Sequence, residues 1–279
     1  MPYTAEISRA NPSCFLFLID QSGSMADPFG AGESSRRKAD GVADAINRLL
    51  QNLVIKCAKE EGVRDYYHVG VIGYGAHVGP AFSGTLAGRE LVPVSEIGNM
   101  PARIENRTKK VDDGAGGVVD QPIRFPIWFD PVANGGTPMC QALGRAQAIL
   151  QGWLSQHPAC FPPIVINITD GEATDGDPSG VAEAIRKLSS NDGEVLLFNV
   201  HLSSQRATPI EFPDTEAGLP DQFAQLLFRM SSPLPAYMRS IAQQEGYKVS
   251  EGTKGFVFNA DIVAVIRFLD IGTRPSDLR

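Results

Sequence analysis

The chain is predicted to fold as an α/β domain, with a doubly wound, mainly parallel sheet, an antiparallel edge strand and helices on both faces. Near-continuous apolar runs at residues 14–19, 164–169 and 195–200 predict strands that are covered on both faces. Between these runs, apolar residues recur at three- and four-residue steps, which is the pattern of helices packed on a sheet. Such alternation is typical of parallel strands joined by crossover helices.

The first half of the chain predicts a strand, a helix and a second strand that turns back. The run at 14–19 stops at Asp20 and a Gly/Ser turn. Apolar residues at helical spacing follow from about residue 36 to residue 57 and predict a helix at 36–57. Residues 66–74 are rich in strand-forming side chains. The glycine turn after them leads into Val78, which predicts a short antiparallel strand at the edge of the sheet.

The second half predicts further helices and strands. A helix follows Pro138, which suits the first helical position, and another helix follows Asp177 as its cap. A short helix is expected near residues 223–228. Residues 255–258 predict the last strand, and Asn259 is expected to cap a final helix.

One domain with two insertions accounts for the whole length. The 279 residues are 43% hydrophobic and 20% charged, which is an ordinary globular composition. The 28 glycines and 20 prolines exceed average usage, and two stretches that break the strand–helix rhythm, at about 106–133 and 203–235, hold many of them. The first stretch is expected to form a loop or a hairpin. Because no linker separates two cores, residues 1–279 are expected to form a single domain with its core at about 13–270.

Charge and cysteine content restrict the classes of partner. The 25 basic and 32 acidic residues give a net charge of -7, which disfavours general electrostatic binding of nucleic acid. No apolar run approaches the length of a membrane helix, and the first eleven residues lack the plan of a secretory signal. The four cysteines form no C-x-x-C pair and are expected to be reduced. We therefore expect a cytoplasmic protein that binds neither nucleic acid nor membranes.

Two of the predicted strands end in aspartate. The first is followed by Asp20, Ser22 and Ser24 at alternate positions, and the second by Asp170. Ligand sites of doubly wound sheets lie at the carboxyl ends of the strands, so neighbouring strands would bring these side chains into one crevice. A glycine turn adds the hydroxyl of Thr137 at the mouth of a helix. Carboxylate and hydroxyl oxygens suit Mg²⁺, or Mn²⁺, whereas a set without sulfur or imidazole disfavours zinc.

Together these three loops resemble the metal-ion-dependent adhesion site (MIDAS) of von Willebrand factor type A (VWA) domains. The resemblance rests on Asp-x-Ser-x-Ser after an apolar strand, Gly-Gly-Thr-Pro before a helix, and a strand that ends in Thr-Asp-Gly. It implies a Rossmann-like VWA fold, in which Ser22, Ser24 and Thr137 give hydroxyl oxygens to the metal ion. Asp20 and Asp170 would bind the ion directly or through water. A protein partner would complete the coordination with an Asp or Glu carboxylate.

The architecture without a secretion signal is most similar to bacterial intracellular members of this family. Some of these are encoded with protein kinases and phosphatases in stress or tellurium-resistance-type systems. The similarity implies a non-catalytic protein-interaction module in a bacterial stress or metal-resistance signalling system, with kinase or phosphatase partners. The separation of Asp20 and Thr137 is long for compact members, and the insertion at 106–133 lies directly before the threonine loop. This insertion is in a position to cover or extend the metal face.

Two other functions stay open at this point. In the first, Asp20 is a phosphoryl-accepting nucleophile of a magnesium-dependent phosphatase or phosphotransferase, as in haloacid-dehalogenase-like phosphatases. Those enzymes have the motif Asp-x-Asp, whose second aspartate is the general acid. Ser22 stands at that position here, so the general acid is missing. In the second, the ion is purely structural and only stiffens the loops of a scaffold.

Other charged residues near these motifs have simpler interpretations. Asp177 is expected to cap a helix, and Glu172 and Asp175 are expected to be solvated loop residues. A basic cluster at the start of the first insertion and just before it is expected to be a solvated face; its members are Arg103, Arg107, Lys109 and Lys110.

Overall fold

A central sheet runs through the computed structural model, which describes residues 3–28, 36–112, 117–202, 208–260 and 267–268. Within these residues the sheet has eight strands. Its members are β1 (Ser13–Asp20), β4 (Tyr67–Tyr74), β5 (Val78–Pro80), β6 (Val92–Pro93), β9 (Ile164–Thr169), β10 (Leu196–Leu202), β11 (Ile210–Glu211) and β12 (Phe256–Ala260). The strand order is β11-β12-β10-β9-β1-β4-β5, and β6 pairs with β4.

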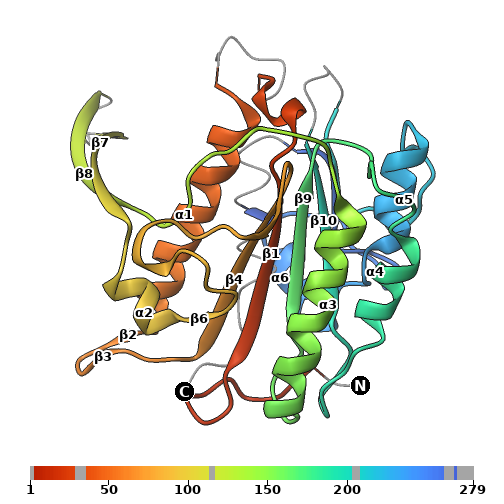
Figure 1. The fold of residues 1–279 in the computed structure, drawn as a ribbon, viewed down its shortest axis with the longest axis horizontal. Helices are drawn as coiled ribbons and strands as arrows, with labels where there is room; N and C mark the ends of the chain where they lie inside the picture. Colours follow the sequence, from red (N-terminus) through yellow and green to blue (C-terminus); the bar gives the residue numbers. More distant parts are fainter. Residues whose placement is uncertain (1–2, 29–35, 113–116, 203–207, 261–266, 269–279) are drawn as a thin grey trace.

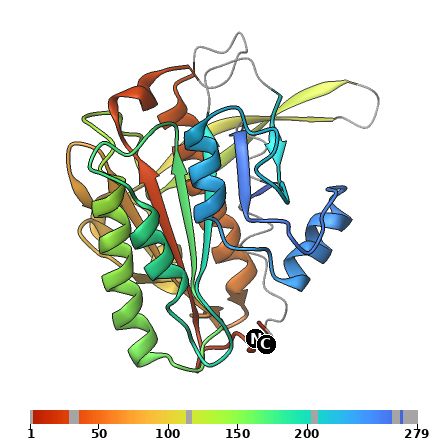
Figure 2. The same ribbon diagram turned by 90° about the vertical axis from the view of Figure 1, so that its right-hand side faces the viewer.

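Helices cover both faces of this sheet (Figures 1 and 2). They are α1 (Lys38–Cys57), α2 (Val94–Asn99), α3 (Met139–Gln156), α4 (Ser179–Arg186), α5 (Gln222–Met230) and α6 (Ala236–Gln244). Buried side chains of α1, α2 and α6 belong to one core layer, and those of α3, α4 and α5 belong to the other. None of the helices in the described part of the chain is both long and apolar enough to span a bilayer.

The alternation of side chains along β1 explains its continuous apolar sequence. Phe15 and Phe17 point into the core layer under α1, whereas Leu16 and Leu18 point into the layer under α3. All four are at most 3% exposed. A strand that is buried on both faces needs apolar residues at every position, as the sequence predicted. The predicted α/β fold class, with its mainly parallel sheet and helices on both faces, is confirmed.

The register of β1 places two strand ends side by side. It runs parallel to β4 on one side and to β9 on the other, with Ile19 opposite Ile168. The helix that follows β1 covers one face of the sheet, and the helix that precedes β9 covers the other. The point between β1 and β9 is therefore where the winding reverses, and ligand crevices form at such points.

Both edges of the sheet end in an antiparallel strand. The predicted one is β5, which pairs with β4 through Tyr74 and Val78. The other is β11, which pairs with β12 and which the sequence did not predict. The stretch at 106–133 contributes a long two-stranded hairpin, β7 (Arg103–Asp112) and β8 (Val118–Ile127), that pairs over its full length. A smaller pair joins β2 (Ala58–Lys59) to β3 (Gly62–Val63).

Helix ends differ slightly from the sequence predictions. Pro138 and Pro178 were predicted at the first helical position, but they stand at the N-cap positions of α3 and α4, so each helix begins one residue later than predicted. Asn259 was predicted as a cap but lies within β12, with a φ of 53°. The final helix expected after it lies almost entirely outside the described residues.

His201, on β10, is predicted to make the stability of the protein depend on pH. Its ring stacks on Phe258 with the ring centroids 4.7 Å apart, and its Nδ1 has no hydrogen-bond partner among the described residues. Burial lowers the pKa of His201 from 6.5 to about 4, while Asp221 and Asp170 act to raise it and Lys38 to lower it. The unfolded chain therefore binds a proton between pH 6.5 and 4 that the folded protein does not.

Stability should consequently fall as the pH falls through this window. We expect this group to cost about 2 kcal/mol of unfolding free energy between pH 7.5 and pH 5. Urea denaturation at both pH values should show that His201→Phe loses this part of the pH dependence. An unchanged difference between the two pH values in the variant would contradict the prediction.

Candidate functional site

Asp20, the last residue of β1, forms the buried floor of the candidate site. The residue is 0% exposed. Its Oδ1 accepts a hydrogen bond of 2.8 Å from the Ser22 N–H, and its Oδ2 accepts one of 2.7 Å from the Thr169 hydroxyl. Burial raises the pKa of Asp20, and the bonds from Thr169 and Ser22 partly oppose this rise. Both hydrogen-bond donors are neutral, so neither compensates the charge of the carboxylate.

A chain of hydroxyl groups connects this floor to Asp170. The Oγ atoms of Ser22 and Ser24 lie 3.0 Å apart. The Ser24 hydroxyl then donates a hydrogen bond of 2.8 Å to Oδ1 of Asp170. Ser22 is buried and Ser24 is exposed, so the chain leads from the interior to the surface. The structure thus brings four of the predicted site residues together.

Lys38, the first residue of α1, binds the same carboxylate. Its Nζ lies 2.8 Å from Oδ2 of Asp170, and the exposed fractions of the two side chains are 4% and 0%. Lys38 was not among the site residues predicted from the sequence. A signal was available, because a lysine in the first turn of a helix is unfavourable beside the positive end of the helix dipole. Such a residue needs a specific anionic partner.

The loop that carries Thr137 packs directly against the serine loop. The Gly23 N–H donates to the Gly135 carbonyl at 2.9 Å. Gly135 has a φ of +87°, and a Cβ there would lie 2.4 Å from the backbone nitrogen of Ala76, so a side chain is excluded. Within the described residues, however, no hydrogen bond joins Thr137 to either serine. Its N–H donates to the Thr174 hydroxyl, and its carbonyl accepts from the Thr174 N–H, both at 2.9 Å.

Asp175 was predicted to be a solvated loop residue, and this prediction is wrong. Its carboxylate accepts hydrogen bonds from the N–H groups of Cys140 and Gln141, at 3.0 and 2.9 Å. Burial acts to raise the pKa of Asp175, but these backbone bonds lower it overall. The loop after β9 therefore caps the first turn of α3 and, through the bonds of Thr174, also holds the loop that carries Thr137.

The charge and chemistry of this cluster fit a divalent cation. The two buried carboxylates are Asp20, whose hydrogen-bond donors are neutral, and Asp170, which pairs with the ammonium group of Lys38. The potential ligands are all oxygen atoms, which Mg²⁺ and Mn²⁺ prefer. In the part of the chain that the structure describes, no group of three or more His, Cys, Asp or Glu residues is arranged to hold a metal ion. A cation here would therefore depend on hydroxyl and water ligands as well as on the two carboxylates.

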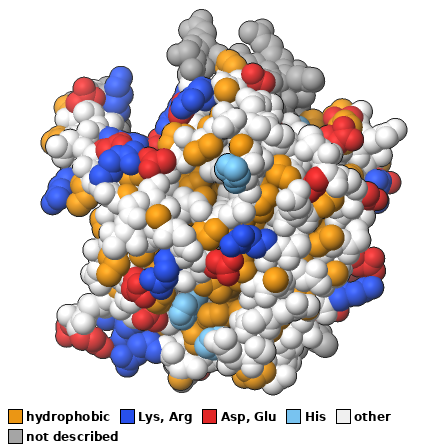
Figure 3. All heavy atoms as spheres, in the orientation of Figure 1, with side chains coloured by type: hydrophobic (Ala, Val, Ile, Leu, Met, Phe, Trp, Pro, Cys, Tyr) orange, Lys and Arg blue, Asp and Glu red, His pale blue; other side chains and the backbone are white. Residues whose placement is uncertain are grey.

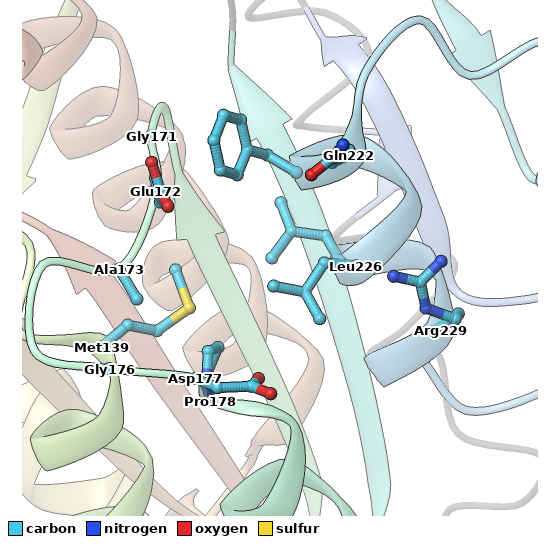
Figure 4. Close-up of a pocket in the computed structure, with 12 residues that line it drawn as sticks. Met139, Gly171, Glu172, Ala173, Gly176, Asp177, Pro178, Gln222, Leu226 and Arg229 are labelled. Carbon is cyan, nitrogen blue, oxygen red and sulfur yellow. The ribbon is translucent and has the colours of Figure 1, made fainter.

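A pocket of about 370 Å³ adjoins this cluster on the side of α5 (Figure 4). Gly171 and Glu172, directly after Asp170, form one wall, and Leu226 of α5 forms the opposite wall. Phe223 also lines the pocket and is 39% exposed. The surface beside the carboxylates is thus concave, and a side chain of a partner that entered the pocket would meet both apolar and charged groups.

Comparison with known proteins shows likeness at the level of the fold. No protein-family model matches the sequence, and no curated protein matches it. Among solved structures, the chain is similar to the vWF domain of the type V pili tip protein Mfa5 from Porphyromonas gingivalis, with 16% identity over 58% of this chain and a TM-score of 0.31. It is also similar to the PilB minor pilin from Streptococcus sanguinis, with 11% identity over 95% of this chain and a TM-score of 0.44.

The chain spans less than two thirds of these proteins. The matched parts are 39% of the Mfa5 vWF domain chain, 20% of a longer Mfa5 chain with three N-terminal domains, and 61% of PilB.

Removal of the lysine should destabilise the protein. Lys38→Met keeps an unbranched side chain of similar length but leaves both buried carboxylates without a counter-ion. We expect the free energy of unfolding to fall by about 3 kcal/mol in urea denaturation with a chelator present. Arg37→Met is the matched control, because Arg37 is exposed and its one ion-pair partner in the described part of the chain is Asp40. Equal stability of the two variants would contradict the proposed charge balance.

Loss of the Asp175 cap should weaken the start of α3. In Asp175→Ala the N–H groups of Cys140 and Gln141 lose their acceptor, and we expect a cost of about 1–2 kcal/mol. Thermal and urea unfolding measure this cost. Glu172→Ala, which removes an exposed carboxylate from the same loop, should change stability by less than about 0.5 kcal/mol. An Asp175→Ala protein as stable as that control would show that the cap contributes nothing.

Proposed function

We propose that the chain is a non-catalytic protein-binding module of the VWA type. The residues that would hold its Mg²⁺ or Mn²⁺ are Asp20, Ser22, Ser24, Thr137 and Asp170. The observation that carries the proposal is the uncompensated negative charge at the ends of β1 and β9, where the buried Asp20 carboxylate has only neutral hydrogen-bond donors among the described residues and Lys38 pairs with Asp170. When bound, the cation would supply positive charge for an Asp or Glu carboxylate of a protein partner.

Each side chain has a separate task in this proposal. Asp20 provides a fixed negative charge below the site, because its two hydrogen bonds hold its orientation. Ser22 and Ser24 provide hydroxyl oxygens that lie 3.0 Å apart. The Asp175 cap and the Thr174 bonds hold Thr137 in the neighbouring loop. Lys38 occupies Oδ2 of Asp170, so ligation through that oxygen requires the ammonium to move.

The burial of Asp20 favours this function over phosphoryl transfer. A nucleophilic carboxylate must reach the phosphorus atom of its substrate, whereas the carboxylate of Asp20 is fully buried and both of its oxygens accept hydrogen bonds. Ser22, at the position of the general acid, bonds to Ser24. A scaffold with a purely structural ion is the second candidate, and it is separated from the first by the partner measurement below.

We further propose that the module works in the bacterial cytoplasm, in a stress or metal-resistance signalling system with kinase or phosphatase partners. The four cysteines are free thiols, three of them buried, which suits a reducing compartment. Burial raises the pKa of Cys57 to about 12 and that of Cys160 to about 11, so these thiols are unreactive.

The proposal is tested by isothermal titration calorimetry, in which Mn²⁺ is titrated into the metal-free protein and its affinity is measured. Asp20→Asn and Thr137→Ala should each weaken binding at least about tenfold, or 1.4 kcal/mol. Ser155→Ala is the control, because it removes an exposed hydroxyl on α3 that donates to the Gly152 carbonyl of the same helix. Metal affinity unchanged in both site variants would exclude the assigned ligands.

Partner binding distinguishes the adhesion-type module from the scaffold. Proteins captured on the immobilised chain in Mg²⁺ should be released by a chelator and should not bind to Thr137→Ala. If the ion only stiffens the loops, chelation would lower the melting temperature and leave the affinity for the partner unchanged.

A further inference from the structure

A groove lies between α1 and the hairpin formed by β7 and β8, away from the residues assigned to the metal. Figures 1 and 2 show the hairpin leaving the body of the protein beside α1. The space between them has a volume of about 660 Å³. The groove is called the basic groove here, and its basic and amide side chains are Arg48, Gln51 and Asn52 of α1 and Arg107, Lys109 and Arg124 of the hairpin. None of these residues belongs to the candidate metal site.

The basic groove carries a net positive charge on an acidic protein. Asp44 is the one acidic residue among the described residues that line it, and this carboxylate is neutralised by ion pairs with Arg36 and, at 2.9 Å, with Arg107. Arg48, Lys109 and Arg124 form no ion pair with any residue that the structure describes. Three cations therefore remain for a ligand, whereas the whole chain has a net charge of -7. Figure 3 shows Lys and Arg side chains on the projecting hairpin, with Asp and Glu side chains among them.

The groove is held open by buried contacts at the base of the hairpin. Asn47 of α1 is 1% exposed, and its Oδ1 accepts from the N–H groups of Trp128 and Phe129 at 2.8 and 3.0 Å. Its Nδ2 donates to the Phe129 carbonyl at 2.8 Å. Higher on the hairpin, the guanidinium carbon of Arg107 lies 4.0 Å from the ring centre of buried Phe125. A ligand would thus meet cations whose backbone positions are already fixed, which lowers the entropy cost of binding.

The shape and charge of the groove suit an extended acidic segment. Residues 44–52 of α1 extend over about 12 Å, and the cations come from both walls along this length. Several carboxylates spaced along a chain can each meet one cation, whereas a single small anion reaches only a few of them. Nucleic acid is less favoured, because Phe125 is 4% exposed and offers no face for base stacking.

We propose that the basic groove binds an acidic segment of a partner protein. Arg48, Lys109 and Arg124 pair with Asp or Glu side chains of the segment, and Gln51 and Asn52 provide hydrogen bonds to it. This goes beyond the proposed metal-dependent function, because it needs no cation and uses none of the five proposed metal ligands.

Fluorescence anisotropy with a labelled peptide of ten glutamates tests the proposal. The full chain is measured with a chelator present, so that a failure here says nothing about the metal site. The variant Arg48→Glu/Lys109→Glu/Arg124→Glu should bind the peptide at least about tenfold more weakly than the wild type. Binding should also weaken as NaCl is raised, because exposed charges are screened. A peptide of ten glutamines should not bind.

Matched controls separate the groove from the net charge. Lys59→Glu/Lys187→Glu/Lys248→Glu makes the same change of net charge at exposed sites outside the groove and should retain the affinity of the wild type. The neutral variant Arg48→Gln/Lys109→Gln/Arg124→Gln also has to lose affinity, which covers the case in which the charge-reversed protein folds poorly. Equal losses in the control, or no binding by the wild type, would overturn the proposal. Tighter binding of a ten-nucleotide single strand that depends on the same three residues would also overturn it.

Discussion

The balance of charge between Asp20, Asp170 and Lys38 is the constraint on which the rest of the site depends. Parallel pairing of β1 with β9 brings both aspartates to the same edge of the sheet. Two carboxylates in a desolvated place repel each other, and each is costly to keep ionised. Hydroxyl and N–H donors orient them, but among the described residues Lys38 alone brings an opposite charge within ion-pair distance, to Asp170. The serine loop, the Thr169 hydroxyl and the start of α1 all take positions that this requirement explains.

The sequence predicted the centre of the fold because burial on both faces leaves a clear pattern. A strand such as β1 or β9 has apolar residues at nearly every position, and its end is marked by a polar residue and a glycine. The same local signal located Asp20, Ser22, Ser24 and Asp170, which follow strands directly. The short antiparallel strand after Tyr74 was predicted for a similar reason, since a glycine turn lies between it and a strong strand.

Features that depend on distant segments were not predicted. The bond of Lys38 to Asp170 joins residues 132 positions apart, and that of Asp175 to Cys140 joins residues 35 positions apart. A lysine at a helix start and an aspartate in a loop are ordinarily solvated, so their sequence context alone favours the wrong interpretation. Strand β11 has two residues and no pattern of its own, because its pairing with β12 defines it. The insertion at 106–133 was expected to be a loop or a hairpin in a position to cover or extend the metal face, and the described part is a hairpin that lies beside α1.

Helix α1 links the two surfaces, and its packing determines how they influence each other. Lys38 begins the helix at the candidate metal site, Asn47 holds the base of the hairpin, and Arg48 lines the basic groove. Twelve of its 20 residues are buried, so the helix cannot shift without repacking the core. The lysine side chain, by contrast, has a flexible stem and can leave Asp170 by rotation alone. Metal binding would then leave the groove unchanged, and the two surfaces would act as independent contacts at a fixed spacing. A partner could place a carboxylate at the candidate metal site and an acidic segment in the basic groove. Because both contacts would belong to one molecule, its overall affinity would be high even if each contact alone were weak.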